Sequence, residues 1–112
     1  MPGEIVLITG AGHGIGKELA LQYASKGATV VGWDINTTNL NATITEIANR
    51  NFPKAHAYTC NVESRDEIMT TADKVQKEVG TVTILVNNAG IMPCRPFLSQ
   101  TKEEIEKTMS IN

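Results

Sequence analysis

Closely spaced glycines near the N-terminus form the segment of this chain best suited to hold a charged ligand. Residues 9–16 read TGAGHGIG; they follow the apolar run IVLI at residues 5–8 and lead into an amphipathic stretch over residues 15–24. A strand that passes through a glycine-rich turn into a helix leaves backbone N–H groups bare at the positive end of the helix dipole. Such an end binds anions, so the turn predicts the pyrophosphate site of a nucleotide cofactor.

Three of the glycines have separate tasks in this predicted turn. Gly10 permits the tight exit from the strand, whereas Gly14 and Gly16 let the backbone approach a phosphate and let the helix pack closely on the sheet. A flexible surface loop is the alternative interpretation. Four glycines within seven residues, placed between a buried strand and a helix, favour nucleotide binding over that loop.

Two other phosphate-binding patterns do not fit the turn. The pattern G-x-x-x-x-G-K-[ST] needs a glycine where Ala11 stands, and it needs serine or threonine where Glu18 stands. The pattern G-x-G-x-x-G fails as well, because Gly10 and Gly12 would require a glycine at Ile15.

An acidic residue follows the next strand pattern, eighteen positions after Gly16. This residue, Asp34, can accept hydrogen bonds from both hydroxyls of an adenosine ribose and repel a 2′-phosphate. Ile35 comes next and no arginine stands there to receive a phosphate, so we expect NAD rather than NADP. The alternative role for Asp34 is an N-cap of the following helix. His13 is a weaker candidate, either above the phosphates or ribose or solvated in the turn.

A second polar turn, with the sequence NNAG at residues 87–90, ends the fourth strand pattern. Its side-chain amides and Gly90 would lie at the carboxyl edge of the sheet, where ligands bind in this architecture. An ordinary asparagine-rich turn is the alternative when the motif is taken alone.

These residues need a scaffold, and strand-like and helix-like patterns alternate along the whole chain. We expect strands at residues 5–9, 29–33, 55–60 and 81–87, and helices at residues 14–26, around residues 40–48, and after the capping boxes Ser64/Glu67 and Thr101/Glu104. The alternation predicts an α/β fold with a parallel sheet covered by helices on both faces. A phosphate turn after the first strand predicts strand order 3-2-1-4, with the third strand at an edge.

Composition excludes several other classes of function. The chain has 112 residues, a formal net charge of -2 and 41% hydrophobic residues, which suits one small globular unit and does not favour nucleic-acid binding. Its apolar runs are too short for a transmembrane helix, and no signal peptide is visible. Cys60 and Cys94 fit no metal-binding spacing, so we expect reduced thiols and no metal site.

Taken together, the glycine turn, Asp34 and the NNAG turn resemble the short-chain dehydrogenase/reductase family over the whole chain. Residues 3–16 and the sequence WDIN at residues 33–36 are most similar to the branch of 17β-hydroxysteroid dehydrogenases and epidermal-type retinol dehydrogenases. The resemblance implies a Rossmann-type doubly wound sheet, truncated here before its remaining strands. It also implies an NAD-dependent oxidoreductase acting on the CH–OH group of an apolar alcohol such as a retinoid or steroid.

The resemblance further implies a role for each matching residue. The pyrophosphate would be held by Gly10, Gly14, Ile15 and Gly16, and the adenosine ribose by Asp34. Asn61 and Val62 would stand beside the adenine, with Asn61 in place of the aspartate usual in the family. The central cofactor path would be lined by Asn88, Ala89 and Gly90, and Asn112 would be the catalytic asparagine that helps hold a water in the proton relay.

The family's catalytic serine and its Y-x-x-x-K motif have no counterpart in these 112 residues. Tyr23 is followed by lysine after three positions rather than four, and Tyr58 is followed by Val62 at the fourth position. We therefore interpret residues 1–112 as the N-terminal, dinucleotide-binding part of a single dehydrogenase domain, and expect this fragment to be inactive alone.

The sequence also fits two other functions: a non-catalytic NAD-binding module that kept the fold, and an NADP-dependent reductase. For the parent protein, the resemblance implies a homodimer on the cytoplasmic side of the endoplasmic reticulum membrane or a lipid droplet. The predicted partner is a small apolar alcohol or carbonyl substrate, with no nucleic acid.

Overall fold

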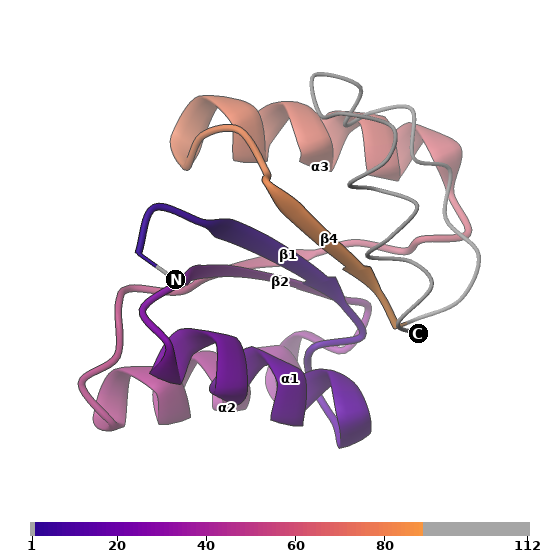
Figure 1. Ribbon diagram of the computed structural model, residues 1–112. Helices are drawn as coiled ribbons and strands as arrows, with labels where there is room; N and C mark the ends of the chain where they lie inside the picture. The colour runs from indigo at the N-terminus through magenta and orange to yellow at the C-terminus, as the bar shows by residue number, and fades with distance from the viewer. Residues whose placement is uncertain (1, 89–112) are drawn as a thin grey trace.

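The computed structural model describes residues 2–88, which form alternating strands and helices (Figure 1). The strands are β1 (Ile5–Thr9), β2 (Thr29–Asp34), β3 (His56–Thr59) and β4 (Ile84–Asn87). The helices are α1 (Gly14–Ser25), α2 (Thr37–Asn49) and α3 (Arg65–Glu78). Within residues 2–88 the predicted alternation is confirmed, although β3 and β4 are shorter than the predicted ranges 55–60 and 81–87. The helix predicted after Thr101 lies outside the described residues.

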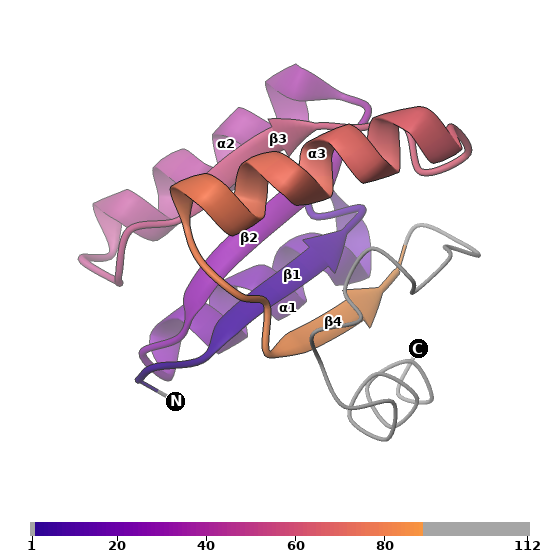
Figure 2. The same cartoon turned by 90° about the horizontal axis from the view of Figure 1, so that it is seen from above.

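All strand pairs are parallel, and the strands lie in the order β3-β2-β1-β4, as predicted (Figure 2). The register aligns Thr9 at the end of β1 with Trp33 of β2 and with Asn87 of β4. Asp34 is in turn aligned with Thr59 at the end of β3. The carboxyl ends of the four strands therefore meet at one edge of the sheet, which positions the turns that follow them.

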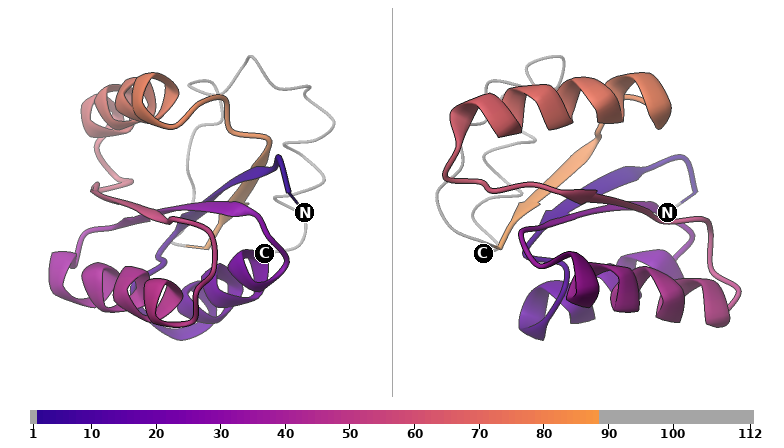
Figure 3. Two further views of the ribbon diagram at one scale, coloured as in Figure 1. Left: turned by 90° about the vertical axis from the view of Figure 1, so that its left-hand side faces the viewer. Right: turned by 180° about the vertical axis from the view of Figure 1, so that it is seen from behind.

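Helices cover both faces of the sheet, with α1 and α2 on one face and α3 on the other (Figure 3). Alternate residues of β1 point to opposite faces, so Val6 and Ile8 pack in the core beneath α1 and α2 while Leu7 packs in the core beneath α3. Both faces of β1 are thus buried, which explains its unbroken apolar sequence.

The helix ends show which capping interactions the local sequence predicted correctly. Gly27 follows the C-cap of α1 with φ +90, the left-handed backbone that favours glycine, as predicted for a helix stop. At α3, the Ser64 hydroxyl caps the helix by accepting a hydrogen bond from the Glu67 N–H at 3.3 Å. The reciprocal half of the predicted capping box is wrong, because the Glu67 carboxylate instead accepts from the N–H of Asn61 at 3.1 Å.

A hydrogen bond between β3 and α3 makes the stability of the fold depend on pH in the alkaline range. The Tyr58 hydroxyl donates to the Glu78 carboxylate at 2.6 Å. Burial, followed by this hydrogen bond and the charge of Glu78, raises the pKa of Tyr58 to about 12. The unfolded chain loses the phenol proton near pH 10 while the folded chain keeps it, so this contribution is present below pH 10 and is lost between about pH 10 and 12.

We therefore expect the Tyr58→Phe variant to lose less stability than the wild type as pH rises from 10 to 12. Urea unfolding across this range measures the difference, and comparison of the two proteins cancels the titration of lysines. Glu78→Gln should also lose less stability than the wild type between pH 10 and 12, because Glu78 supplies two of the three causes that raise the pKa of Tyr58. An identical loss of unfolding free energy in all three proteins would contradict the role given to the Tyr58–Glu78 hydrogen bond.

Within residues 2–88, no helix combines the length and the apolar character needed to cross a bilayer.

Candidate functional site

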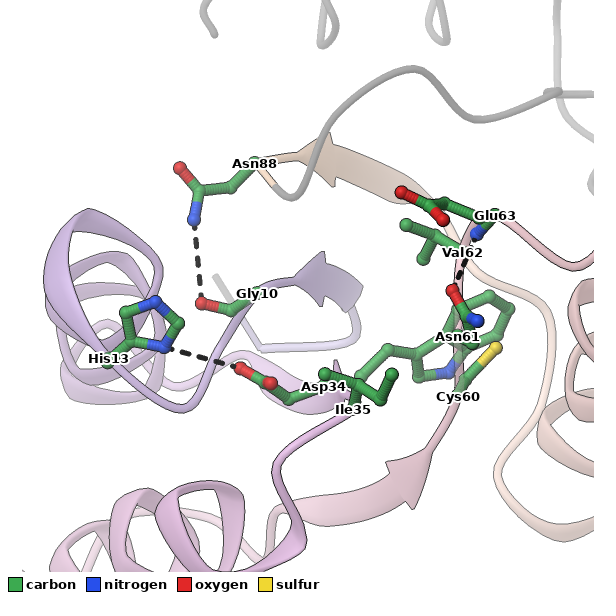
Figure 4. Close-up of a pocket in the computed structure, with 10 residues that line it drawn as sticks. Gly10, His13, Asp34, Ile35, Cys60, Asn61, Val62, Glu63 and Asn88 are labelled. Atoms are coloured by element: carbon green, nitrogen blue, oxygen red, sulfur yellow. Dashed lines mark hydrogen bonds and ion pairs between the residues drawn. The ribbon is translucent and has the colours of Figure 1, made fainter.

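A pocket of about 440 Å³ opens at the carboxyl edge of the sheet (Figure 4). Its walls come from the ends of β1, β2 and β4 and from the segment that follows β3. Its lining residues are Gly10, His13, Trp33, Asp34, Ile35, Cys60, Asn61, Val62, Glu63 and Asn88. Six of these were predicted as cofactor residues from sequence, although they lie up to 78 positions apart along the chain.

The N-terminus of α1 borders this pocket and is left without a side-chain cap. His13 occupies the N-cap position but makes no capping hydrogen bond, whereas Asn36 caps α2 and Ser64 caps α3. The first turn of an uncapped helix offers its N–H groups to a ligand. A Cβ at Gly14 would meet no atom within 4 Å, so the backbone there is open to close approach, and its φ of +58 favours glycine. These features fit a phosphate group.

Gly16 fixes the distance between α1 and the end of β1. A Cβ on Gly16 would lie 2.0 Å from the Gly10 carbonyl oxygen and 2.6 Å from the Asn88 amide nitrogen. Ile15 lies beside it in the first turn and is exposed, so it belongs to the helix end without lining the pocket. The predicted tight packing of this helix against the sheet is therefore confirmed.

A hydrogen-bonded chain ties β4 to the glycine turn. The Thr9 hydroxyl donates to the Asn87 side-chain oxygen at 3.1 Å and accepts from the Asn88 N–H at 2.9 Å. The Asn88 side-chain amide then donates to the Gly10 carbonyl at 3.4 Å (Figure 4). Asn88 thus holds the glycine turn against the end of β4. The role of Thr9 follows from the strand register, which aligns it with Asn87.

Asp34 lines the pocket with a carboxylate, and its side chain is only 4% exposed. One oxygen, Oδ2, accepts from the Gly12 N–H at 2.9 Å, and the other, Oδ1, accepts from the Asn36 N–H at 2.9 Å. The alternative role of Asp34 as an N-cap is wrong, because the Asn36 side chain caps α2 by accepting from the Asn39 N–H. A carboxylate has about four acceptor positions, so acceptor capacity remains for the hydroxyls of a ribose.

His13 stands at the mouth of the pocket with 72% of its side chain exposed. Its Nδ1 atom lies 3.7 Å from Oδ2 of Asp34 (Figure 4). The imidazole is therefore solvated and also faces the Asp34 carboxylate, so both interpretations of this residue remain predictions.

The segment after β3 forms the opposite wall of the pocket. The Asn61 side-chain oxygen accepts from the Glu63 N–H at 2.9 Å, so it already fixes its own loop, and its amide group retains further hydrogen-bonding capacity. Val62 is half-buried against the core beneath α3. Burial raises the pKa of the neighbouring Cys60 thiol, more than its hydrogen bond with Thr71 lowers it, so Cys60 is a poor nucleophile at neutral pH.

Three predicted site residues, Ala89, Gly90 and Asn112, lie outside the described residues. Two contributions to the site were missed by sequence reasoning. One is the hydrogen bond by which the Gly12 N–H holds the Asp34 carboxylate, called the Gly12 clamp below. The other is the Thr9 hydroxyl, which links Asn87 to Asn88 through two hydrogen bonds and is called the Thr9 relay below. The sequence marks Gly12 as part of the glycine turn, but it does not identify Asp34, 22 positions away, as the hydrogen-bond partner of the Gly12 N–H.

Comparisons with known proteins place this geometry in one family. The sequence model of the short chain dehydrogenase family matches residues 4–112. Epidermal retinol dehydrogenase 2 of Mus musculus is 47% identical over 98% of this chain and 36% of the mouse protein. 17-beta-hydroxysteroid dehydrogenase 13 of Homo sapiens is 46% identical over 98% of this chain and 36% of the human protein. The chain thus spans about a third of the length of these relatives.

Solved structures share the fold at similar coverage. A hydroxysteroid dehydrogenase from Escherichia coli is 43% identical, with a TM-score of 0.75 over 80% of this chain and 38% of its own. An oxidoreductase from Haemophilus influenza with bound NAD is 31% identical, with a TM-score of 0.76 over 81% of this chain and 32% of its own. A metagenomic short-chain oxidoreductase in complex with NADP is 33% identical, with a TM-score of 0.76 over 81% of this chain and 41% of its own.

The glycine turn, the parallel sheet in order 3-2-1-4, and the matches over nearly the whole chain lead to one conclusion: this chain belongs to the short-chain dehydrogenase family and has its Rossmann fold.

Proposed function

We propose that this chain is the cofactor-binding part of an NAD-dependent oxidoreductase that acts on the CH–OH group of an apolar alcohol, such as a retinoid or a steroid. The observation that carries the proposal is the buried Asp34 carboxylate inside a pocket bordered by the uncapped end of α1. The names of the retinol and hydroxysteroid dehydrogenases that it resembles support the class of substrate.

Each part of the site has a task in this proposal. The N–H groups at Gly14, Ile15 and Gly16 would bind the pyrophosphate, and Asp34 would accept the hydroxyls of the adenosine ribose. Asn61 and Val62 would border the adenine. When bound, NAD supplies the hydride acceptor of the reaction.

The preference for NAD over NADP follows from charge. A 2′-phosphate on the ribose would come close to the Asp34 carboxylate, whose side chain is only 4% exposed. Like charges at short range in a partly desolvated site repel. Ile35, the next residue along the wall, offers no compensating cation.

Calorimetric titrations of the protein, one with NAD and one with NADP, test the proposal. We expect NAD to bind at least about tenfold more tightly, which corresponds to roughly 1.4 kcal/mol. Tighter binding of NADP would remove the role given to Asp34, and binding of neither would reject the cofactor site.

The proposal also predicts that the 112 residues alone bind cofactor weakly and do not oxidise an alcohol, because they contain no Y-x-x-x-K motif. Alcohol-dependent formation of NADH by the purified chain would overturn this part. For the whole protein, we propose a homodimer on the cytoplasmic side of the endoplasmic reticulum membrane or a lipid droplet, by analogy with the family branch.

A further inference from the structure

The feature that goes beyond this function is the contact between Gly12 and Asp34. The Gly12 N–H and the Asn36 N–H each hold one carboxylate oxygen at 2.9 Å, and they approach from two different segments. A carboxylate with one hydrogen bond can rotate about its side-chain torsions, whereas one held at both oxygens is fixed in place. The orientation of Asp34 is thus set before any ligand arrives.

The absence of a side chain on Gly12 is also required for this contact. A Cβ at position 12 would lie 2.7 Å from Oδ2 of Asp34, 3.0 Å from Cβ of Asn39 and 3.1 Å from the backbone nitrogen of Leu40. Leu40 is held in α2 by a hydrogen bond to the Asn36 carbonyl at 3.0 Å. The carboxylate, at the end of a side chain, is the group that would move.

We propose that Gly12 is a positioning residue for cofactor preference: it holds the Asp34 carboxylate where it accepts the ribose hydroxyls of NAD. The inference rests on the proposed function of Asp34 and adds the residue that sets its position. Displacement of the carboxylate removes the paired acceptance of two hydroxyls, and it also moves the negative charge that repels a 2′-phosphate. Both effects lower the preference for NAD.

The test is the ratio of the dissociation constants of NADP and NAD in wild type, Gly12→Ala, Asp34→Ala and the double variant. For Gly12→Ala we expect NAD to bind about tenfold more weakly and NADP to change by less than about threefold, which reduces the ratio at least about threefold. In the Asp34→Ala background, the Gly12 substitution should leave the ratio unchanged, since its effect acts through the carboxylate.

Gly32→Ala is the matched control. Gly32 lies in β2, and a Cβ there would approach Leu40 Cδ1 at 2.9 Å and Ala11 Cβ at 3.0 Å rather than Asp34. Both substitutions crowd Leu40 of α2, but only Gly12→Ala also crowds Asp34. We therefore expect Gly32→Ala to reduce stability and leave the NADP/NAD ratio unchanged. An unchanged ratio in Gly12→Ala, or an equal effect with and without Asp34, would overturn the inference.

A second measurement needs no cofactor and no substitution at Gly12. The hydrogen exchange of the Gly12 amide, followed by NMR, should be at least about tenfold faster in Asp34→Ala than in wild type, because the bond to Oδ2 is lost. Equal exchange would show that the clamp does not exist in solution. If exchange responds but wild type prefers NADP, the proposed function fails while the contact stands.

Discussion

Replacement of Gly16 by alanine should lower the free energy of unfolding by about 3 kcal/mol and weaken NAD binding by roughly tenfold or more. Alanine ordinarily stabilises a helix relative to glycine by about 1 kcal/mol, so the expected sign is the reverse of the intrinsic preference. The reason is the Gly10 carbonyl oxygen, which would lie 2.0 Å from the new Cβ. That carbonyl cannot move freely, because the Gly10 N–H is bonded to the Trp33 carbonyl at 2.7 Å and the oxygen accepts from Asn88.

Gly14→Ala is the control variant, because it replaces a glycine of the same helix turn without creating a steric clash. A Cβ at Gly14 would meet no atom, so only the cost of an alanine at φ +58 remains, about 1 to 2 kcal/mol. Chemical denaturation of both variants gives the stability difference, and calorimetry with NAD gives the affinities. Equal destabilisation by the two substitutions would show that the contact between α1 and the Gly10 carbonyl is looser than described.

Asp34→Ala is expected to have the second large effect, weakening NAD by about 2 to 3 kcal/mol, or roughly 30- to 150-fold, through the lost hydrogen bonds to the ribose. NADP should lose little affinity, because its 2′-phosphate no longer meets a negative charge. The same substitution removes the acceptor for the buried Gly12 N–H, which should cost about 1 to 3 kcal/mol of stability.

Glu63→Gln is the matched control for charge, since Glu63 lines the same pocket on the wall opposite His13 (Figure 4). We expect it to leave the ratio of NADP to NAD dissociation constants near the wild-type value. A shift as large as that in Asp34→Ala would mean that the overall negative charge of the pocket, rather than the placement of one carboxylate, decides the preference.

The prediction from sequence was most accurate where a signal is contained in a few neighbouring residues. The apolar runs of β1 and β4, the glycine stop after α1 and the Ser64 cap each depend on local periodicity or turn chemistry, and the structure has them. It was less accurate where a side chain had a choice of partners. Glu67 could reach the Ser64 N–H or the Asn61 N–H, and only the path of the loop after β3 selects Asn61.

The same division applies to Asp34. Sequence spacing identified it as a candidate for the ribose and also as a candidate N-cap, and both roles suit an aspartate after a strand. The structure gives the cap to Asn36 and turns the Asp34 carboxylate toward the Gly12 N–H. The choice depends on how the glycine turn lies over β2, which is a contact between segments 22 positions apart.

The sequence by itself determined the alternation of elements, the strand order, the position of the glycine turn and the family, because these follow from periodicity and short motifs. Only the tertiary structure decided how the site is held together: the clamp of Gly12 on Asp34, the relay from Thr9 to Asn88, and the exclusion of any side chain at Gly16. These contacts join residues up to 79 positions apart. The register of parallel strands brings them within hydrogen-bonding distance, and that register is fixed by the packing of both cores rather than by any one segment.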